Sequence, residues 1–408
     1  MMGRFLVMDV VFYGSSLNYD QGSGNYQELK KITRWDGRQY TLVSRYALRY
    51  SLLETGQKLG LWEVADGAKF VESGTGDKTV IQPAVDLLFN GDILLYPEFD
   101  LFGYLITSLT PQASRVSPTK LSHAISLTPF QYDTQFAGNL GLAKRRLPIK
   151  GKMDINIFTI EEHFTYYIYS IVVDVDALCK NEVYISAKDK DWTAKVTENN
   201  ESYILEISGN KAKKEGINSK YVIPKERVVR IKNSQGNHVN AIIRTRVEKI
   251  LDRDNKTVLV YHLIQELSSP EINIRAERLK KLLKAVLHLK RSIKGREEDL
   301  RPRLLVLGVY KNKPYQTFKD RIELLDEYTE EEYDEIEEVE ENGKKILRVK
   351  HRVSKSRKPV FRIHGIKNTP QELNEEDILD AVEKLFNEEK DFAEVKVFKD
   401  PMIEVKLE

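Results

Sequence analysis

The sequence predicts an α+β fold, because two kinds of apolar pattern alternate along it. Short runs of aromatic and β-branched residues are typical of strands, whereas two other segments place leucine and other apolar residues at helical spacing. A length of 408 residues is enough for two or three folding units. Hydrophobic residues make up 41% and charged residues 31%, which allows a sizeable core and excludes a collagen-like, coiled-coil or wholly disordered protein.

The N-terminal elements follow one another closely. Phe5–Tyr13 is short, apolar and followed by Gly14, which predicts a buried strand. A loop rich in Asn, Gly, Tyr and basic residues is expected over Leu17–Tyr40. Ser44 then precedes apolar residues at helical spacing and Gly56 provides a stop signal, so a helix is predicted between them.

The middle of the chain alternates irregular and strand-like segments. Residues 60–127 mix turns with short apolar runs, and Phe136–Lys152 is Gly-rich, basic and almost without periodicity. Phe164–Val175 has the aromatic and β-branched composition of a strand. From Asn181 to Leu267 we expect strands and hairpins with turns at three polar clusters, Glu198-Asn199-Asn200, Ser234-Gln235-Gly236-Asn237 and Asp252–Asn255.

A second helix and a last strand complete the main pattern. The helix is predicted from an apolar stripe of Leu279, Leu282, Leu283, Val286 and Leu287. The strand is predicted over Arg303–Tyr310. The order strand, helix, strands, helix, strand, with long insertions, is that of a ferredoxin-like or RNA-recognition-motif-like α+β unit.

The charge distribution divides the chain near residue 320. Residues 321–408 hold 16 Lys and Arg against 25 Asp and Glu, whereas residues 1–320 hold 48 against 37. Glu323–Glu341 is strongly acidic, Lys350–Arg362 is basic, and a helix is predicted over Glu375–Phe386. The last part is either a small appended α/β unit or a partly mobile acidic segment. A basic body indicates a polyanionic partner.

Several classes of protein are excluded by what the sequence lacks. No run reaches the ~18 apolar residues of a membrane span, and Asp9 interrupts the N-terminal apolar run that follows Arg4, so a targeting segment is not expected. A single cysteine, Cys179, rules out an intramolecular disulfide framework. Phosphate-loop, dinucleotide-binding, nucleophile-elbow and zinc-protease spacings are all missing. We therefore expect a cytoplasmic protein without a metal or cofactor.

Three basic segments are candidates for binding a polyanion. The first, in the loop and helix after the first strand, contains Lys30, Lys31, Arg34, Arg38, Arg45 and Arg49. Gly, Asn, Ser and Tyr are interleaved among these cations and suit close backbone approach and base stacking on single-stranded nucleic acid. Arg45 and Arg49 are four residues apart and share a helix face. The alternative interpretation is a solvated loop and helix face.

The other two segments lie further along the chain. Residues 115–126 place cationic and His side chains among small hydroxyl residues, at Arg115, Lys120 and His123, and a surface turn is the equal alternative. Residues 137–152 place cations between flexible glycines, at Lys144, Arg145, Arg146, Lys150 and Lys152. Leu140, Leu142 and Leu147 stand among those cations, which favours an extended arm that docks on a partner.

Base readout is not predicted. The basic-Gly-aromatic-Gly-aromatic octapeptide typical of RNA-recognition motifs is missing. Tyr166, Tyr167 and Tyr169 are more typical of sheet interior than of base stacking. RNA binding would therefore depend on phosphate contacts and shape.

The order of these features resembles a known family. SLNYDQGSGNYQELKKITRWDGRQYTLVSRYALRYSLLETG at 16–56, DLFGYLITSLTPQASRVSPTKLSHAISLTPFQYDTQF at 100–136, HFTYYIYSIVVDVDAL at 163–178 and RPRLLVLGVY at 301–310 occur in sequence. Together they resemble the backbone subunit of type I CRISPR Cascade complexes, in its type I-B, DevR-type branch of the Cas-seven superfamily. The large stretch 181–270 and the tail 321–408 have no counterpart that the resemblance explains.

The resemblance implies a hand-shaped, non-catalytic scaffold for antiviral defence. Copies would polymerise along the CRISPR RNA, each thumb folding over the guide, which then pairs with target DNA beside other Cascade subunits. The implied guide-binding residues of the palm are Asn18, Lys30, Lys31, Ser44, Arg45 and Arg49. The implied parts are a palm strand, guide-binding loop and helix (1–60), a finger insertion (61–128), a thumb (129–162), a palm strand (163–180), a β-rich insertion (181–270), a palm helix and strand (271–320) and an acidic extension (321–408).

Two rival functions stay open. Type III relatives cleave target RNA with an acidic residue near the guide-binding loop, and Asp20 and Asp36 lie in the comparable loop here. A single carboxylate in a Gly-rich loop is more often a turn former. The other rival is a DNA-binding autoregulator, for which no helix-turn-helix pattern is found.

Overall fold

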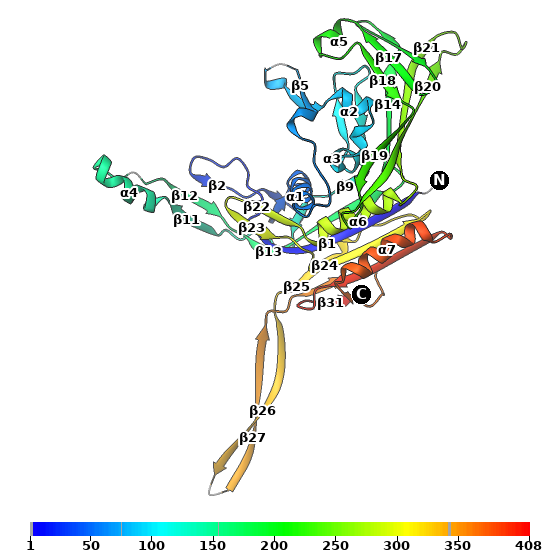
Figure 1. The fold of residues 1–408 in the computed structure, drawn as a ribbon. Coiled ribbons are helices and arrows are strands. Elements are labelled where there is room, and N and C mark those ends of the chain that lie inside the picture. Colours follow the sequence, from blue (N-terminus) through cyan, green and yellow to red (C-terminus); the bar gives the residue numbers. More distant parts are fainter. Residues whose placement is uncertain (1–2, 75, 154, 342–343) are drawn as a thin grey trace.

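The computed structural model of the chain describes residues 3–74, 76–153, 155–341 and 344–408. Strands dominate, and the helices pack on them, so the predicted α+β class is confirmed (Figure 1). None of the helices in these ranges is long and apolar enough to cross a membrane.

A mixed sheet forms the centre of the molecule. Its strands follow the order β29-β30-β24-β1-β13-β10-β4-β3, and β9 also pairs with β13. β1 and β24 are nearly continuous in apolar residues because side chains are covered on both faces. The bounds are β1 Arg4–Ser15, β3 Lys31–Thr33, β4 Gln39–Val43, β9 Thr119–Leu121, β10 Ala124–Ser126, β13 Phe164–Asp174, β24 Leu304–Lys311, β29 Gln371–Glu372 and β30 Phe392–Lys399.

Three helices pack with one set of side chains from the central sheet. Leu6, Met8, Val10 and Phe12 of β1 belong to the same core cluster as the buried leucines of α1 and α6 and the apolar face of α7. Each helix begins at a polar side chain that accepts a backbone N–H: Ser44, Asn273 and Asn374. α1 runs past the predicted stop at Gly56. The bounds are α1 Arg45–Lys58, α6 Ile274–Leu287 and α7 Glu375–Asn387.

The opposite side of the central sheet is covered by the C-terminal part of the chain. Val11, Val306 and Ile168 pack with Phe318 and Phe361 in a second core cluster. β30 also pairs with β24 along its whole length. The expected appended unit is therefore part of the main sheet and core. Its small sheet contains β25 Ile322–Asp326, β28 Val360–Ile363 and β31 Glu404–Leu407.

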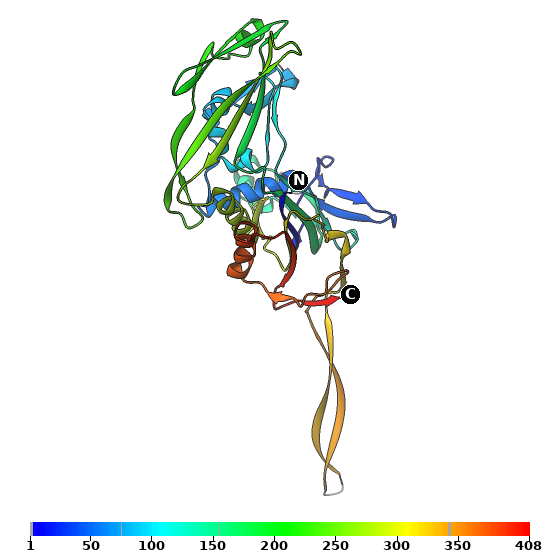
Figure 2. The same ribbon diagram turned by 90° about the vertical axis from the view of Figure 1, so that its right-hand side faces the viewer.

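The acidic and basic stretches of the tail form one long hairpin. β26 (Thr329–Glu341) pairs with β27 (Lys344–Ser356), and Figures 1 and 2 both show the hairpin projecting away from the rest of the molecule. Cross-strand ion pairs join Lys350 to Glu337 at 2.5 Å, Arg352 to Glu335 at 2.9 Å and Lys355 to Glu330 at 2.6 Å. The acidic strand therefore neutralises much of the charge of the basic strand.

The stretch 181–270 forms two further sheets above the central one (Figure 1). All three predicted turns lie at hairpin tips or strand ends, between β16 and β17, β19 and β20, and β20 and β21. One sheet has the order β14-β21-β20-β19 and the other β15-β16-β17-β18. The bounds are β14 Lys180–Ser186, β15 Lys188–Asp189, β16 Trp192–Glu198, β17 Ser202–Ser208, α5 Asn210–Lys214, β18 Lys220–Pro224, β19 Glu226–Lys232, β20 His238–Leu251 and β21 Val258–Ser268.

Two smaller regions complete the fold. The region 61–128 contains short elements, namely β5 Phe70–Ser73, β6 Val80–Pro83, α2 Val85–Phe89, α3 Pro97–Asp100, β7 Tyr104–Ile106 and β8 Ala113–Arg115. A projecting arm and a small hairpin lie near the loop after β1, where the predicted loop itself contains short strands. Their bounds are β2 Tyr26–Gln27, β11 Thr134–Gly138, α4 Leu140–Lys150, β12 Ile157–Glu161, β22 Lys290–Ile293 and β23 Arg296–Asp299.

Candidate nucleic-acid interface

The start of α1 is fixed by the loop that follows β1. Asn18 Oδ1 accepts the backbone N–H of Ser44 at 2.9 Å, and the Asn18 carbonyl accepts the N–H of Lys30 at 2.9 Å. Ser44 Oγ in turn accepts the N–H of Ala47 at 3.2 Å and caps the helix. Asn18 and Ser44 are thus bonded within the protein and position the basic residues that follow them.

Arg45 and His123 form the centre of the exposed cationic surface. Because β4 pairs with β10, the turn before β10 lies beside the first turn of α1. The backbone N–H of Arg45 donates to His123 Nδ1 at 3.0 Å, so the neutral ring carries its hydrogen on Nε2. Burial and the nearby Arg45 lower the pKa of His123. The Arg45 guanidinium lies 4.9 Å from the Tyr46 ring centroid.

Further cations lie on β9 and in the chain before α1. Lys120 is exposed on β9, and Lys30 is partly exposed with its Nζ 3.7 Å from Asp20. Arg34 is exposed and lies 5.1 Å from the centre of the Tyr40 ring. Trp35, between β3 and β4, is 92% exposed. The predicted loop and helix therefore present cations and aromatic rings together.

The side chains of Lys31 and Arg49 make their contacts within the protein. Lys31 Nζ lies 2.6 Å from Glu161, in an ion pair whose side chains are mostly buried, and 4.7 Å from the Phe130 ring centroid. Arg49 is half-buried against Phe102, and this burial lowers its pKa. Both side chains hold the loop and helix in place, so the structure does not support direct phosphate contacts for them.

Arg115 requires the clearest correction. Its guanidinium is buried and donates to Asp100 Oδ1 at 2.8 Å and to the Ala177 carbonyl at 2.9 Å. Asp100 is fully buried and needs such partners, because an isolated buried carboxylate is costly. Arg115 is therefore a structural residue, and its engaged side chain is not placed to contact RNA.

The third basic segment forms the tip of the projecting arm. Figure 1 shows α4 at the far end of the β11–β12 hairpin. The predicted irregular segment is a helix, although it contains Pro148. Leu140, Leu142 and Leu147 are exposed there, as predicted, and so are the side chains of Lys144, Arg145, Arg146 and Lys150.

The β22–β23 hairpin places cations beside the loop after β1, and these residues were not predicted from the sequence. Lys294 lies at its turn, with Nζ 4.0 Å from the Tyr19 ring centroid. Arg291 Nε donates to the Leu17 carbonyl at 2.8 Å, and Arg296 approaches Glu162 at 3.4 Å. The sequence pattern that could have identified this hairpin is the run KRSIKGR at 290–296, whose basic residues flank a glycine turn.

The alternative catalytic residues have ordinary structural surroundings. Asp36 accepts the N–H of Arg38 at 3.0 Å and the hydroxyl of Tyr40 at 2.8 Å, and these bonds help to lower its pKa. Cys179 is buried, and burial raises the pKa of its thiol to about 12. Among the described residues, no group of three or more His, Cys, Asp or Glu side chains has the geometry to hold a metal ion.

The fold and its exposed cations define a mixed α+β protein with a candidate polyanion-binding surface. The sequence profile described as "CRISPR-associated negative auto-regulator DevR/Csa2" matches residues 6–333, so the chain belongs to this family and the resemblance is confirmed. A comparison with curated proteins gives no match. A solved chain titled "CRISPR RNA-guided surveillance complex, pre-nicking" is similar at 9% identity and a TM-score of 0.37, covering 76% of this chain and 80% of that chain.

Proposed function

We propose that this protein is a non-catalytic, CRISPR RNA-binding backbone subunit of a type I-B Cascade complex. The observation that carries the proposal is the exposed group around Arg45 and His123, in a member of a CRISPR-associated family. Lys30 and Arg34 belong to the chain between β1 and α1, Lys120 lies on β9 three residues before His123, and Lys294 approaches Tyr19 of the loop after β1. Copies of the chain line the guide, and the guide pairs with target DNA in antiviral defence.

The chemistry of this surface suits a phosphate backbone. An Arg guanidinium binds two phosphate oxygens through parallel N–H bonds, and the start of a helix favours an anion. Exposed Tyr46 and Trp35 provide rings on which a base can stack. Because these contacts read no base edge, binding is independent of sequence, as a guide of variable sequence requires.

The topology supports the palm of a modified RNA-recognition motif. Four strands follow the order β24-β1-β13-β10, and every neighbouring pair among them is antiparallel. α1 follows β1 and α6 follows β13 along the chain, with α6 preceding β24. This matches the split β-α-β arrangement of ferredoxin-like folds, and the β11–α4–β12 arm takes the place of the thumb.

The arm is the proposed contact between neighbouring copies. Its exposed leucines would remain in water in a free monomer, and burying a leucine contributes ~1.5–3 kcal/mol. Assembly and guide binding then reinforce one another, since one RNA spans several copies. Other Cascade subunits would cap the two ends of such an array.

Purification of the protein from its host tests the proposal. We expect small RNA of uniform length to copurify, and complementary RNA to remain intact when divalent metal is added. Cleavage of that RNA, abolished in Asp20→Ala or Asp36→Ala, would instead establish the nuclease. Selective binding to promoter DNA without guide RNA would establish the autoregulator.

A further inference from the structure

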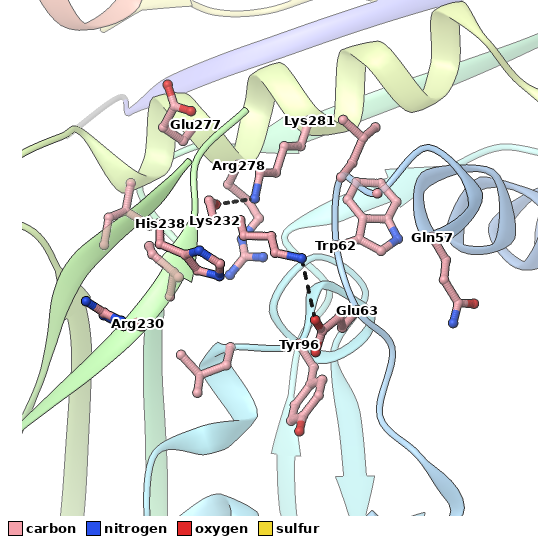
Figure 3. A pocket seen from close by; sticks show the side chains of 15 residues that line it. Gln57, Trp62, Glu63, Tyr96, Arg230, Lys232, His238, Glu277, Arg278 and Lys281 are labelled. Atoms are coloured by element: carbon pink, nitrogen blue, oxygen red, sulfur yellow. Dashed lines mark hydrogen bonds and ion pairs between the residues drawn. The ribbon is translucent and has the colours of Figure 1, made fainter. Parts of the chain in front are cut away.

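A cavity of about 390 Å³ lies where the β-rich insertion meets the palm helices. α6 forms one wall, β19 and the start of β20 form another, and the chain between α1 and β5 closes the side (Figure 3). The volume falls within the range of ~300–1,000 Å³ that small-molecule sites occupy. The cavity is separate from the surface around Arg45.

Lys281 is the unusual group in this cavity. Its side chain comes from α6, and only 7% of the residue is exposed. The ammonium donates to the Lys232 carbonyl at 2.5 Å, and no ion pair joins it to a carboxylate of the described residues. Burial, reinforced by Arg278 and Lys232 and opposed by Glu277, lowers the pKa of Lys281 to about 8. A buried ammonium without a counter-charge is costly to maintain.

The carboxylates nearby are already engaged by other cations. Glu277 lies 3.5 Å from Lys280, Glu63 lies 3.9 Å from Lys232, and Asp100 lies 3.1 Å from Arg278. Lys281 and Arg230 have no such ion pair among the described residues, and His238 lies between them in Figure 3. The cavity thus has a surplus of positive charge on two of its walls.

The remaining wall is apolar and partly aromatic. Leu61, Trp62, Leu95 and Tyr96 line it, and Figure 3 shows the two rings on the side of the cavity away from Arg230. A site with cations on one side and rings on the other suits a molecule with an anionic group and a flat apolar part.

We propose that this cavity binds a phosphate monoester of mononucleotide size, with its phosphate on the side of Lys281 and Arg230 and its ring on the side of Trp62 and Tyr96. The phosphate supplies the negative charge that the cavity lacks. The same chemistry is offered by a free nucleotide and by the phosphorylated end of an RNA strand.

A ligand bound in this cavity would couple two parts of the fold. Lys281 belongs to α6, which packs on the central sheet, whereas Arg230 and His238 belong to the β-rich insertion. A ligand that contacts both walls therefore restrains the insertion against the palm. This gives the stretch 181–270 a role that the family resemblance does not supply.

Calorimetric titration of the full chain tests the site with four probes: UMP, uridine, and a short RNA with and without a 5′-phosphate. We expect UMP or the phosphorylated RNA to bind with a Kd below about 1 mM, and the unphosphorylated partner of that probe to bind at least tenfold more weakly. Hydrogen exchange at β19 and β20 should slow in the presence of the probe that binds. Whichever source binds identifies the natural ligand class.

Two variants test whether Lys281 and Arg230 contribute to phosphate binding. Lys281→Met and Arg230→Gln should each weaken binding about tenfold or more. Lys284→Met is the matched control, since Lys284 lies one turn further along α6 and pairs with Glu375 at 3.4 Å, and it should change the affinity less than twofold. Absence of phosphate-dependent binding in the wild type, or unchanged affinity in both Lys281→Met and Arg230→Gln, overturns the proposal. Because Arg230 is exposed, its variant keeps the test valid if Lys281→Met fails to fold.

Discussion

Arg278 Nε lies 3.1 Å from Asp100 Oδ2, and both side chains are buried between α6 and α3. Arg115 approaches the other carboxylate oxygen, and the backbone N–H of Cys179 donates to it at 2.9 Å. The Asp100 carboxylate therefore joins β8, the chain that follows β13, and α6.

Removal of the Asp100 carboxylate should destabilise the fold strongly. Asp100→Ala leaves Arg115 and Arg278 buried without a counter-charge, and loss of one partner from a buried ion pair costs ~3–5 kcal/mol. Chemical denaturation measures the change. Asp380→Ala, at an exposed helix position, should stay within ~0.5 kcal/mol. Equal stability of the two variants would contradict the structural role of the cluster.

Charge reversal at Arg45 should weaken RNA binding regardless of sequence. Arg45→Glu removes an exposed cation beside His123, so the salt slope for single-stranded RNA should fall by ~0.7 for each phosphate that the variant no longer neutralises. Fluorescence titrations across a range of salt concentrations measure the slope. Arg246→Glu, exposed on β20 away from this surface, serves as the control. An unchanged slope in Arg45→Glu would assign Arg45 to a solvated helix face.

The arm should matter more for assembly than for single-copy binding. Neutralising Lys144, Arg145 and Arg146 removes cations from the tip of the arm, which projects away from the start of α1 (Figure 1). Mass photometry should therefore show fewer copies on a long RNA and little change on an RNA that accommodates one copy. An equal reduction on both RNAs would remove the thumb assignment.

Truncation after residue 320 should prevent folding, because the tail belongs to the central sheet and core. It removes β30 from the edge of β24 and uncovers Val11 and Val306. Each large side chain left exposed costs ~1.5–3 kcal/mol, against a typical total stability of ~5–15 kcal/mol. Expression of residues 1–320 should give insoluble protein, and a soluble product that melts cooperatively would contradict the integrated core.

Removal of the projecting hairpin alone is the matched comparison. Thr329 pairs with Ser356, so a short Asn-Gly turn in place of 330–355 closes the ribbon near its base. The described side chains of that ribbon are mostly exposed, and its removal should change stability by less than ~1 kcal/mol. A large fall in melting temperature would show that the hairpin supports the body.

Stability should fall below neutral pH in a manner that depends on His163. Burial lowers the pKa of this ring to about 4, below the ordinary 6.5, while Thr41 Oγ1 lies 2.7 Å from its Nδ1. At pH values between about 4 and 6.5, the ring of His163 is protonated in the unfolded chain and neutral in the folded chain. The stabilising contribution is therefore complete above pH 6.5 and is lost towards pH 4, at ~1.4 kcal/mol per unit at most. Denaturation at several pH values should show a shallower decline in His163→Gln, and parallel curves would exclude this ring as the cause.

Much of the secondary structure follows from local patterns. The strands at Phe5–Tyr13, Phe164–Val175 and Arg303–Tyr310, and the helix that Ser44 caps, were predictable because apolar spacing and capping act within a few residues. The exposed leucines of the arm were predictable for the same reason, since glycines and cations surround them. The α4 helix was not, because its Pro148 and sparse apolar residues weaken the local signal.

The sequence by itself determined the α+β class, the order of the elements, the basic body and the family resemblance, since each depends on residue types and short-range spacing. Only the tertiary structure decided which cations face solvent. Arg45 and Arg115 both belong to basic segments of the sequence. Arg45 nevertheless lies on the surface, whereas Arg115 pairs with a carboxylate that folding brings close. The tail likewise joins the core because β24 offers an unpaired edge to β30, a long-range backbone pairing that no local pattern encodes.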